Sequence, residues 1–280
     1  MNKVDFAVII SVRNANPNGD PMSGNSCRVN NENLGVISDV CLKRKLRDRL
    51  AEAGYPIFVQ SDSKASDGYT SLKARADGSL RLVNKENACA QWFDVRAFGQ
   101  LLAWKSADKK DGKSKSKGKT EPKATPEAAS DIGMSLAIRG PVTIQSAFSV
   151  EPIDVQEMQI TKSVNSEDGK GKGSDTMGLK YTTNGVYVTY GSIFPLLAVN
   201  TGFTEIDAAA IKATLPKLFE NDASSARPGG SMRILKVVWW EQPDIKYSSG
   251  RVHDTISVSA DGSYQLANLP GLIPEEINGF

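Results

Sequence analysis

The stretch FAVIISV at residues 6–12 is followed by the polar stretch RNANPNGDPMSGNSCRVN at residues 13–30 and by the basic run KRKLRDR at residues 43–49. The first stretch is rich in Val and Ile, which predicts a largely buried strand over Val4–Val12. The second combines two prolines with Asn, Asp and Gly between residues 16 and 21, which excludes helix and strand pairing and predicts a long loop. Loops of this length in compact domains are usually functional.

A helix is predicted after the loop. Ser38 can cap its N-terminus and Gly54 can end it. Leucines recur at intervals of four, so that one face is apolar. A basic face opposite them is more often simply solvated than bound to nucleic acid, and this face alone favours the solvated interpretation. The leucines are Leu42, Leu46 and Leu50, and the basic face holds Lys43, Arg44, Arg47 and Arg49.

The composition is that of an ordinary soluble globular chain, with 24% charged and 40% hydrophobic residues among 280. A net charge of +2 means that any polyanion must bind through local patches. Three cysteines without metal-ligand spacing argue against a disulfide framework and a zinc site, and favour small buried apolar residues. No apolar run is long enough to cross a membrane and no signal peptide is evident, so we expect a cytoplasmic protein.

The middle of the chain is irregular in composition. A short strand is predicted at Ile57–Gln60, and the polar segment 61–87 could be an inserted subdomain. Trp92–Trp104 predicts a short buried helix interrupted by Gly99. Residues 106–130 contain no large aliphatic residue and should be disordered when free. This lysine-rich insert is either a solubilising linker or an arm that contacts nucleic-acid phosphates transiently.

The second half predicts more strands and one helix. Val142–Val150 alternates, with Val142, Ile144, Ser146, Phe148 and Val150 on one face. A long hairpin is predicted where an excursion at 161–180 precedes a strand at 186–194. A helix capped by Thr204 should kink at Pro216, a strand covers 233–240, and the tail offers a weak hairpin at Asp261–Gly262 before irregular structure.

With the excursions removed, the element order predicts an α+β fold. Merging the minor pieces leaves a βαββαβ plan of the ferredoxin-like or RNA-recognition-motif type, with a long inserted finger region and a thumb hairpin. Function does not follow from such a common scaffold.

Several kinds of site have no signature in the sequence. There is no phosphate-binding GKS or GKT loop, no dinucleotide-binding GxGxxG and no GxSxG nucleophile turn. The single histidine, His253, is best explained as an ordinary tail residue. Asp39 is adequately explained as negative charge at a helix N-terminus and Asp20 as a turn residue. The aromatic RNP1 string of sheet-face RNA readers is absent, so RNA would not bind through the usual base-stacking platform.

Six blocks of the sequence resemble, in the same order, the repeated backbone subunit of CRISPR type I-C Cascade surveillance complexes, a member of the RAMP superfamily. They span Phe6 to about Trp240, and NPNGDP followed by SDVCLKRK is fairly specific. The blocks are RNANPNGDP, GVISDVCLKRKLRDRL, FDVRAFG, GPVTIQSAFSVEPI, TMGLKYTTNGVY and the SSAR loop.

The resemblance implies a non-catalytic protein without cofactor or metal, whose modified RNA-recognition-motif core is likened to a hand. Copies polymerise along the spacer of a guide RNA (crRNA), and the assembly pairs the guide with target DNA for antiviral defence. The implied partners are the guide RNA, other copies of the chain, target DNA, and the large, small and guide-handle-binding subunits, with no membrane.

In similar subunits the palm holds the RNA backbone and the thumb folds over it. Carried onto this sequence, the palm is 1–60, 131–155 and 183–280, the fingers are 61–130 and the thumb is 156–182. The implied RNA contacts of the palm are Arg13, Asn18, Arg28, Ser38, Lys43, Arg44, Lys45 and Arg227. The implied thumb residues are Lys162, Lys170, Lys172 and Lys180, with Met177 or Leu179 as an apolar wedge.

Two other functions stay open. A ribonuclease of the same superfamily could process guide RNA or cut target RNA through Asp20 or Asp39, although no partner base or metal cluster accompanies either carboxylate. A free-standing single-stranded nucleic-acid binding protein is the third possibility, but the chain lacks the interleaved aromatic residues expected there.

Overall fold

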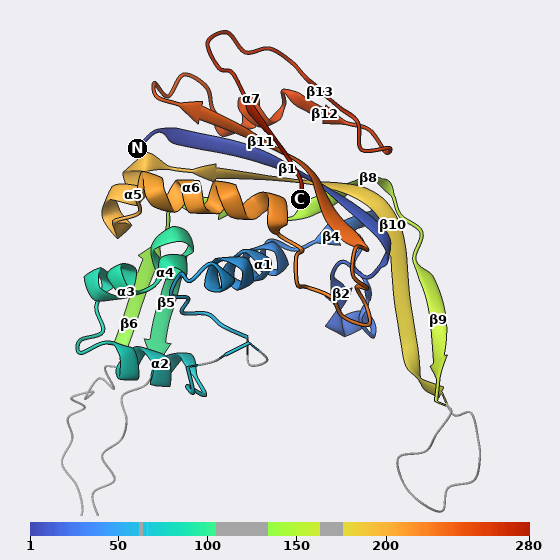
Figure 1. The fold of residues 1–280 in the computed structure, drawn as a ribbon, viewed down its shortest axis with the longest axis horizontal. Helices are drawn as coiled ribbons and strands as arrows, with labels where there is room; N and C mark the ends of the chain where they lie inside the picture. The colour runs from blue at the N-terminus through green and yellow to red at the C-terminus, as the bar shows by residue number, and fades with distance from the viewer. Residues whose placement is uncertain (62–63, 66, 105–133, 163–175) are drawn as a thin grey trace, which may run out of the picture.

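Strand β1 (Lys3–Ala15) lies in the interior of the main antiparallel sheet of a computed structural model that describes residues 1–61, 64–65, 67–104, 134–162 and 176–280 (Figure 1). Its neighbours are β10 (Thr176–Ile193) and β11 (Met232–Gln242). The sheet runs in the order β14-β11-β1-β10-β8-β4, and β7 also pairs with β10. The outer strands are β4 (Leu34–Ile37), β7 (Val142–Ile144), β8 (Ala147–Pro152) and β14 (Glu275–Asn278).

Both faces of β1 are buried. Phe6, Val8 and Ile10 point to a core shared with α1 (Asp39–Glu52) and α6 (Glu205–Thr214). Ala7 and Ile9 point to a second core under α7 (Ser249–His253) and the hairpin of β12 (Ile256–Val258) and β13 (Tyr264–Leu266). Figure 1 shows these two layers on opposite sides of the sheet. Successive side chains of a strand alternate between faces, so burial on both explains the nearly continuous apolar run and confirms the predicted buried strand.

Helix α1 begins and ends where the sequence predicts, and α6 begins at its predicted cap. Ser38 caps α1 by accepting from the amide of Cys41, and Gly54 follows its end with φ +88°. Thr204 and Asp207 form a reciprocal capping box at the start of α6. Pro216 falls in the short 3₁₀ helix η2 (Leu215–Lys217), which confirms the expected split. The helical spacing of this segment runs through Ile206, Ala210, Ala213 and Leu218, but only Ala210 and Leu218 are buried and the other two are exposed.

The loop after β1 is more ordered than predicted. β2 (Gly19–Asp20) pairs with β3 (Ser26–Cys27) around η1 (Pro21–Ser23), so the expectation that this stretch excludes strand pairing is wrong. The two prolines lie outside the paired positions, and the missing proline amides therefore cost the short ladder nothing.

A second, smaller core is built from the segment between α1 and β7. It contains α2 (Leu72–Ser79), α3 (Lys85–Gln91), α4 (Phe93–Phe98) and the pair β5 (Gly99–Trp104) and β6 (Met134–Arg139). The predicted strand at Ile57–Gln60 is wrong, because the amides of Phe58 and Val59 donate to the Asp94 carboxylate at 2.7 and 3.0 Å. This carboxylate takes the place of a neighbouring strand.

The predicted helix over Trp92–Trp104 is only half right. α4 ends at Phe98, and Gly99, whose φ is +80°, begins β5. A Cβ on Gly99 would lie 2.3 Å from the Ile138 carbonyl oxygen, so glycine permits the close approach of β6. The lysine-rich insert lies outside the described residues, and β6 follows it. The partner of β5 is therefore far away in sequence.

The strand predicted at Val142–Val150 is two strands, β7 and β8, separated by Gln145 and Ser146. The interruption shifts the alternation by one residue. Ala147 and Ser149 are buried after it, whereas Phe148 is exposed. The expectation that Phe148 shares a face with Val142 is therefore wrong, as a one-residue shift in a strand reverses its faces.

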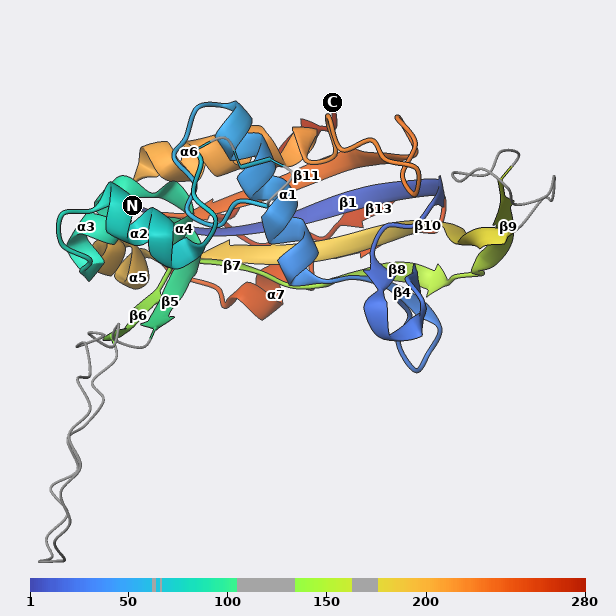
Figure 2. The ribbon, with the colours of Figure 1, turned by 90° about the horizontal axis from the view of Figure 1, so that it is seen from below.

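A two-stranded arm extends from the sheet. β9 (Gln156–Thr161) pairs with the first part of β10 as the hairpin prediction requires, and every described residue of β9 is exposed. Figures 1 and 2 show the arm and the smaller core at opposite ends of the sheet. Residues 163–175, which include Lys170 and Lys172, lie outside the described residues. The tail hairpin is confirmed, but β14 pairs with β11 where irregular structure was expected.

The three cysteines are free thiols. Cys27 and Cys89 are buried and Cys41 is partly buried, in agreement with an apolar role. Burial raises the pKa of the Cys27 thiol to about 11, which keeps it protonated at neutral pH. Within the described part of the chain, no helix is both long and apolar enough to span a membrane.

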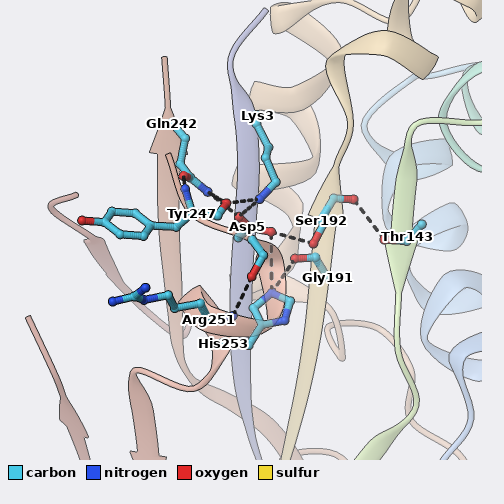
Figure 3. A network of polar contacts seen from close by, with 10 residues as sticks. Lys3, Asp5, Thr143, Gly191, Ser192, Gln242, Tyr247, Arg251 and His253 are labelled. Atoms are coloured by element: carbon cyan, nitrogen blue, oxygen red, sulfur yellow. Dashed lines mark hydrogen bonds and ion pairs between the residues drawn. The ribbon is translucent and has the colours of Figure 1, made fainter. Parts of the chain in front are cut away.

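Asp5 centres a buried polar network at one end of β1 (Figure 3). Its carboxylate accepts hydrogen bonds from Lys3 Nζ at 2.9 Å, Ser192 Oγ at 2.7 Å and Gln242 Nε2 at 2.9 Å. Lys3 Nζ also donates to the carbonyl of Tyr247 at 2.9 Å. The network therefore connects β1, β10, β11 and the turn before α7 inside the protein.

His253 belongs to this network and is not an ordinary tail residue. It is buried, its ring stacks on Tyr190, and its Nε2 lies 3.2 Å from the Gly191 carbonyl oxygen. A carbonyl can only accept, so this contact requires a proton on Nε2. Asp5 Oδ1 lies 3.9 Å from the same nitrogen.

The two titratable groups make stability depend on pH in the same direction. Burial opposes ionisation of Asp5, but hydrogen bonds from Ser249, Ser192 and Lys3 outweigh it and leave its pKa lowered. Burial also lowers the pKa of His253. In the unfolded chain both groups bind protons at higher pH than in the fold, so acid favours unfolding.

We predict that the free energy of unfolding falls as the pH drops below about 6.5, where unfolded histidine protonates, and falls further below about 4, where unfolded aspartate protonates. Asp5→Asn should cost about 3 to 5 kcal/mol at pH 7, because Lys3 is left buried without its counter-ion. Urea unfolding at several pH values measures both effects. Asp244→Asn, at an exposed carboxylate, is the control. An Asp5→Asn protein as stable as the original at pH 7 contradicts the role of Asp5 as the buried counter-ion of Lys3.

Candidate nucleic-acid interface

The loop after β1 is tied to the start of α1 by one side chain. Asn18 Oδ1 accepts from the Ser38 amide at 2.9 Å and from the Ser38 hydroxyl at 2.8 Å. Two residues expected to contact RNA are therefore brought together, and each orders the other. Cys41 adds a weak contact from its sulfur to the Pro17 carbonyl at 3.9 Å.

The N-terminus of α1 is already largely satisfied by the protein. The Ser38 hydroxyl accepts from the Cys41 amide, and the Asp39 amide donates to Ser146 Oγ at 3.2 Å. Asp39 also places a carboxylate in the first turn. The amides of Ser38, Asp39 and Cys41 are therefore not available to a phosphate in this structure.

The expected palm cations differ in how exposed they are. The side chains of Arg13 and Arg44 are exposed and have no partner within the described residues. Lys43 is partly exposed and forms an ion pair with Asp39 at 3.1 Å. Arg28 is partly exposed, and it contacts Asp20 at 3.4 Å and the Gly19 carbonyl at 3.2 Å. Arg13, Arg28, Lys43 and Arg44 are thus accessible to a ligand.

Lys45 and Arg227 lie far apart in the sequence and meet at Asp222. Both pair with Asp222, Lys45 through Oδ1 and Arg227 through Oδ2 at 3.1 Å. Lys45 is buried, and burial lowers the pKa of its amine although Asp222 opposes the shift. An anion cannot reach Lys45 without displacing the carboxylate.

The arm presents apolar side chains to solvent. Met158, Ile160 and Leu179 are 47%, 41% and 48% exposed. Lys162 and Lys180 are partly exposed on the same hairpin. The backbone of Met177 belongs to β10, whereas its side chain lies outside what the structure describes. A wedge of the expected kind is therefore available in Leu179, with two further apolar residues on β9.

The two candidate nuclease carboxylates have structural partners. Asp20 accepts from the Met22 amide and the Ser23 hydroxyl and pairs with Arg28, which holds η1 in place. Asp39 pairs with Lys43. In the ranges that the structure describes, no group of three or more His, Cys, Asp or Glu residues could hold a metal ion.

The sheet face opposite α1 and α6 is not an open platform. Ala7, Ile9 and Val238 on this face are buried under the segment that contains α7, β12 and β13. Bases could not stack on the centre of this face without displacing that segment. That segment does not cover the β1–α1 loop, the exposed part of α1 or the arm.

Sequence reasoning missed Asp222 and Asn16. The side-chain Nδ2 of Asn16 donates to the Asn25 carbonyl at 2.7 Å. Its backbone carbonyl accepts from Arg227 Nη1 at 3.4 Å, and its backbone amide donates to the Ala226 carbonyl at 2.9 Å. No local signal marks Asp222 as the partner of Lys45, which lies 177 residues away.

A model of the family described as CRISPR-associated protein Cas7 matches residues 2–269. The chain belongs to the Cas7 family. A Cas7 protein of Haloferax volcanii is 22% identical over an alignment of 285 positions, which covers 98% of this chain and 80% of the relative.

Two solved structures share the fold. One is described as a CRISPR RNA-guided surveillance complex in a pre-nicking state, with 17% identity, a TM-score of 0.51, and coverage of 93% of this chain and 82% of that chain. The other is described as a CRISPR RNA-guided surveillance complex, with 17% identity, a TM-score of 0.50 and coverage of 93% and 77%. This Cas7-family chain thus shares its fold, which is built on the central antiparallel sheet, with both structures.

One glycine fixes the approach of β4 to the sheet just before the Ser38 cap. A Cβ on Gly35 would lie 2.2 Å from the hydroxyl oxygen of Tyr187 and 2.8 Å from Ile153 Cδ1. Tyr187 is fully buried, so its ring cannot move aside freely. The Gly35 amide is held by Ser149 Oγ at 2.8 Å, which fixes the backbone as well.

We predict that Gly35→Ala destabilises this Cas7-family protein by about 1 to 3 kcal/mol, as overpacking of a tight core does. Thermal unfolding followed by circular dichroism measures the change. Gly229→Ala is the control, because a Cβ there meets nothing within 4 Å and the residue does not have positive φ. Equal melting temperatures for the two variants would show that β4 can move away from Tyr187.

Proposed function

We propose that this chain is the repeated backbone subunit of a type I-C CRISPR surveillance complex. In this role copies bind the spacer of guide RNA, assemble head to tail along it, and hold it for pairing with target DNA in antiviral defence. Membership of the Cas7 family over residues 2–269 is the observation that carries the proposal.

The exposed apolar side chains of the arm favour a protein that assembles with RNA or other copies over one that acts as an isolated monomer. Exposed apolar side chains on a two-stranded hairpin contribute little to the stability of one copy, because isolated hairpins are marginal in water. Ordering such an arm is favourable when it packs against RNA or a neighbouring copy. A head-to-tail contact that does not close generates a filament, which suits a polymeric ligand.

The accessible cations support recognition of the RNA backbone. Arg13 lies near the end of β1, Arg28 lies in the loop, and Lys43 and Arg44 lie on α1, whereas the sheet face opposite α1 and α6 is covered. Contacts to phosphates leave base edges free, as a guide that pairs with a target requires.

The finer assignments are part of the same proposal. The strand order β11-β1-β10-β8, with α1 and α6 on one face, supports a ferredoxin-like or RNA-recognition-motif βαββαβ core. The type I-C subtype, with its large, small and guide-handle-binding partner subunits, rests on the six sequence blocks. We also propose a cytoplasmic location and a scaffolding role without catalysis.

RNA binding by the exposed cations is the first test. We expect the purified protein to carry guide RNA, and Lys43→Ala with Arg44→Ala to weaken binding of single-stranded RNA. The slope of log K against log salt should fall by about 0.7 for each phosphate that the variant no longer neutralises. Fluorescence anisotropy at several salt concentrations measures both quantities.

A matched control removes the same charge elsewhere. Lys246→Ala with Arg251→Ala deletes two exposed cations beside Tyr247, away from α1. Binding that falls equally in both double variants indicates a nonspecific charge effect. Unchanged binding in the Lys43 and Arg44 variant contradicts the palm assignment.

Absence of catalysis is tested on the assembled complex. We expect guide and target RNA to stay intact with Mg²⁺, and Asp20→Ala or Asp39→Ala to change stability alone, because both carboxylates already hold local structure. Gel analysis of end-labelled RNA measures cleavage. Cleavage that either substitution abolishes would favour the ribonuclease alternative.

A further inference from the structure

Three charged side chains that differ in burial form a cluster where α1 meets the loop after η2. Lys45 and Asp222 are 6% and 14% exposed at their side chains, whereas Arg227 is 25% exposed. The carboxylate lies between the two cations, with one oxygen on each. The cluster has one net positive charge, and its most accessible member is the guanidinium.

Backbone contacts fix the position of Arg227. Its amide and carbonyl exchange hydrogen bonds with Ser224 at 3.1 and 2.8 Å, which closes a tight turn. Its Nε is directed at Asp222 and its Nη1 at the Asn16 carbonyl. Within the described residues Nη2 has no hydrogen-bond partner. The guanidinium is held on one side and retains donor capacity on the other.

We propose that Asp222 is a positioning residue, which holds Arg227 ready to bind a phosphodiester of RNA, whereas Lys45 takes no part in holding Arg227 and only pairs with the buried side of the carboxylate. This inference rests on the proposed function and refines it, because it removes Lys45 from the residues that touch RNA. A planar guanidinium fixed by a carboxylate presents its remaining donors in a set direction, which suits phosphate oxygens.

The inference makes a prediction opposite in sign to simple charge counting. Asp222→Asn removes a negative charge beside an anionic ligand, so electrostatics alone predicts tighter RNA binding. If Asp222 positions Arg227, the same isosteric change weakens binding and lowers the salt slope by about 0.7, the value for one phosphate. Asp222→Glu, which keeps the carboxylate, should retain part of the affinity.

Asp222→Asn alone leaves the buried amine of Lys45 without its counter-ion, so the test is also made in a Lys45→Met background. Lys45→Met should leave RNA affinity within about twofold and the salt slope unchanged, because a buried amine makes no phosphate contact. Adding Asp222→Asn to Lys45→Met should then reduce the affinity about tenfold, the effect of about 1.4 kcal/mol. Adding Arg227→Ala to that pair should weaken binding little further, since the effects of neighbours that act together are not additive.

The measurement is anisotropy with a short single-stranded RNA that accommodates one copy, at several salt concentrations, with melting temperatures recorded for each folded variant. RNA binding that becomes tighter when Asp222→Asn is added to Lys45→Met overturns the positioning role. So does a further loss of affinity with Arg227→Ala that is as large as its loss when Asp222 is present. Weaker binding in Lys45→Met with a lower salt slope shows that Lys45 itself contacts RNA, and also overturns it. If the unsubstituted protein binds no RNA, the proposed function fails and not this refinement alone.

Discussion

Burial of β1 on both faces is the constraint on which the rest of the structure depends. A strand without a polar face must be covered twice, and two separate parts of the chain do this: α1 and α6 on one side, and the segment of α7, β12 and β13 on the other. The ends of β1 are then fixed by polar contacts. Asp5 anchors the end near α7, and the loop carrying Asn16 and Asn18 anchors the other end against α1 and the Arg227 turn.

This double covering limits where a nucleic acid can bind. A sheet with helices on one face alone can offer its other face to bases, but here that face contributes to a core. The β1–α1 loop, the exposed part of α1 and the arm stay uncovered, and in the part of the chain that the structure describes they carry exposed cations and apolar side chains. Such surfaces suit backbone recognition, in which the protein holds the polymer and leaves sequence reading to base pairing.

The sequence predicted the elements whose signals are local. The apolar run of β1, the Ser38 cap and the Thr204 capping box each lie within a few residues of the element they define. Predictions failed where a distant residue decides the structure. Asp94 replaces a strand partner for Phe58, and β5 forms because β6 returns after the insert. The shift between β7 and β8 reverses the faces of a pattern that had fitted one strand.

The same division applies to the candidate site. Arg44 and Lys45 are adjacent and look equivalent as cations, but successive helix positions differ by about 100°, so one points to solvent and the other into the interior. Their chemistry then diverges, because the buried amine requires a counter-ion and Asp222 supplies it from 177 residues away. Counting basic residues along α1 therefore overestimates the charge available to RNA. Accessibility depends on the tertiary structure, and a carboxylate at the interface can strengthen binding of an anion when it determines where an arginine points.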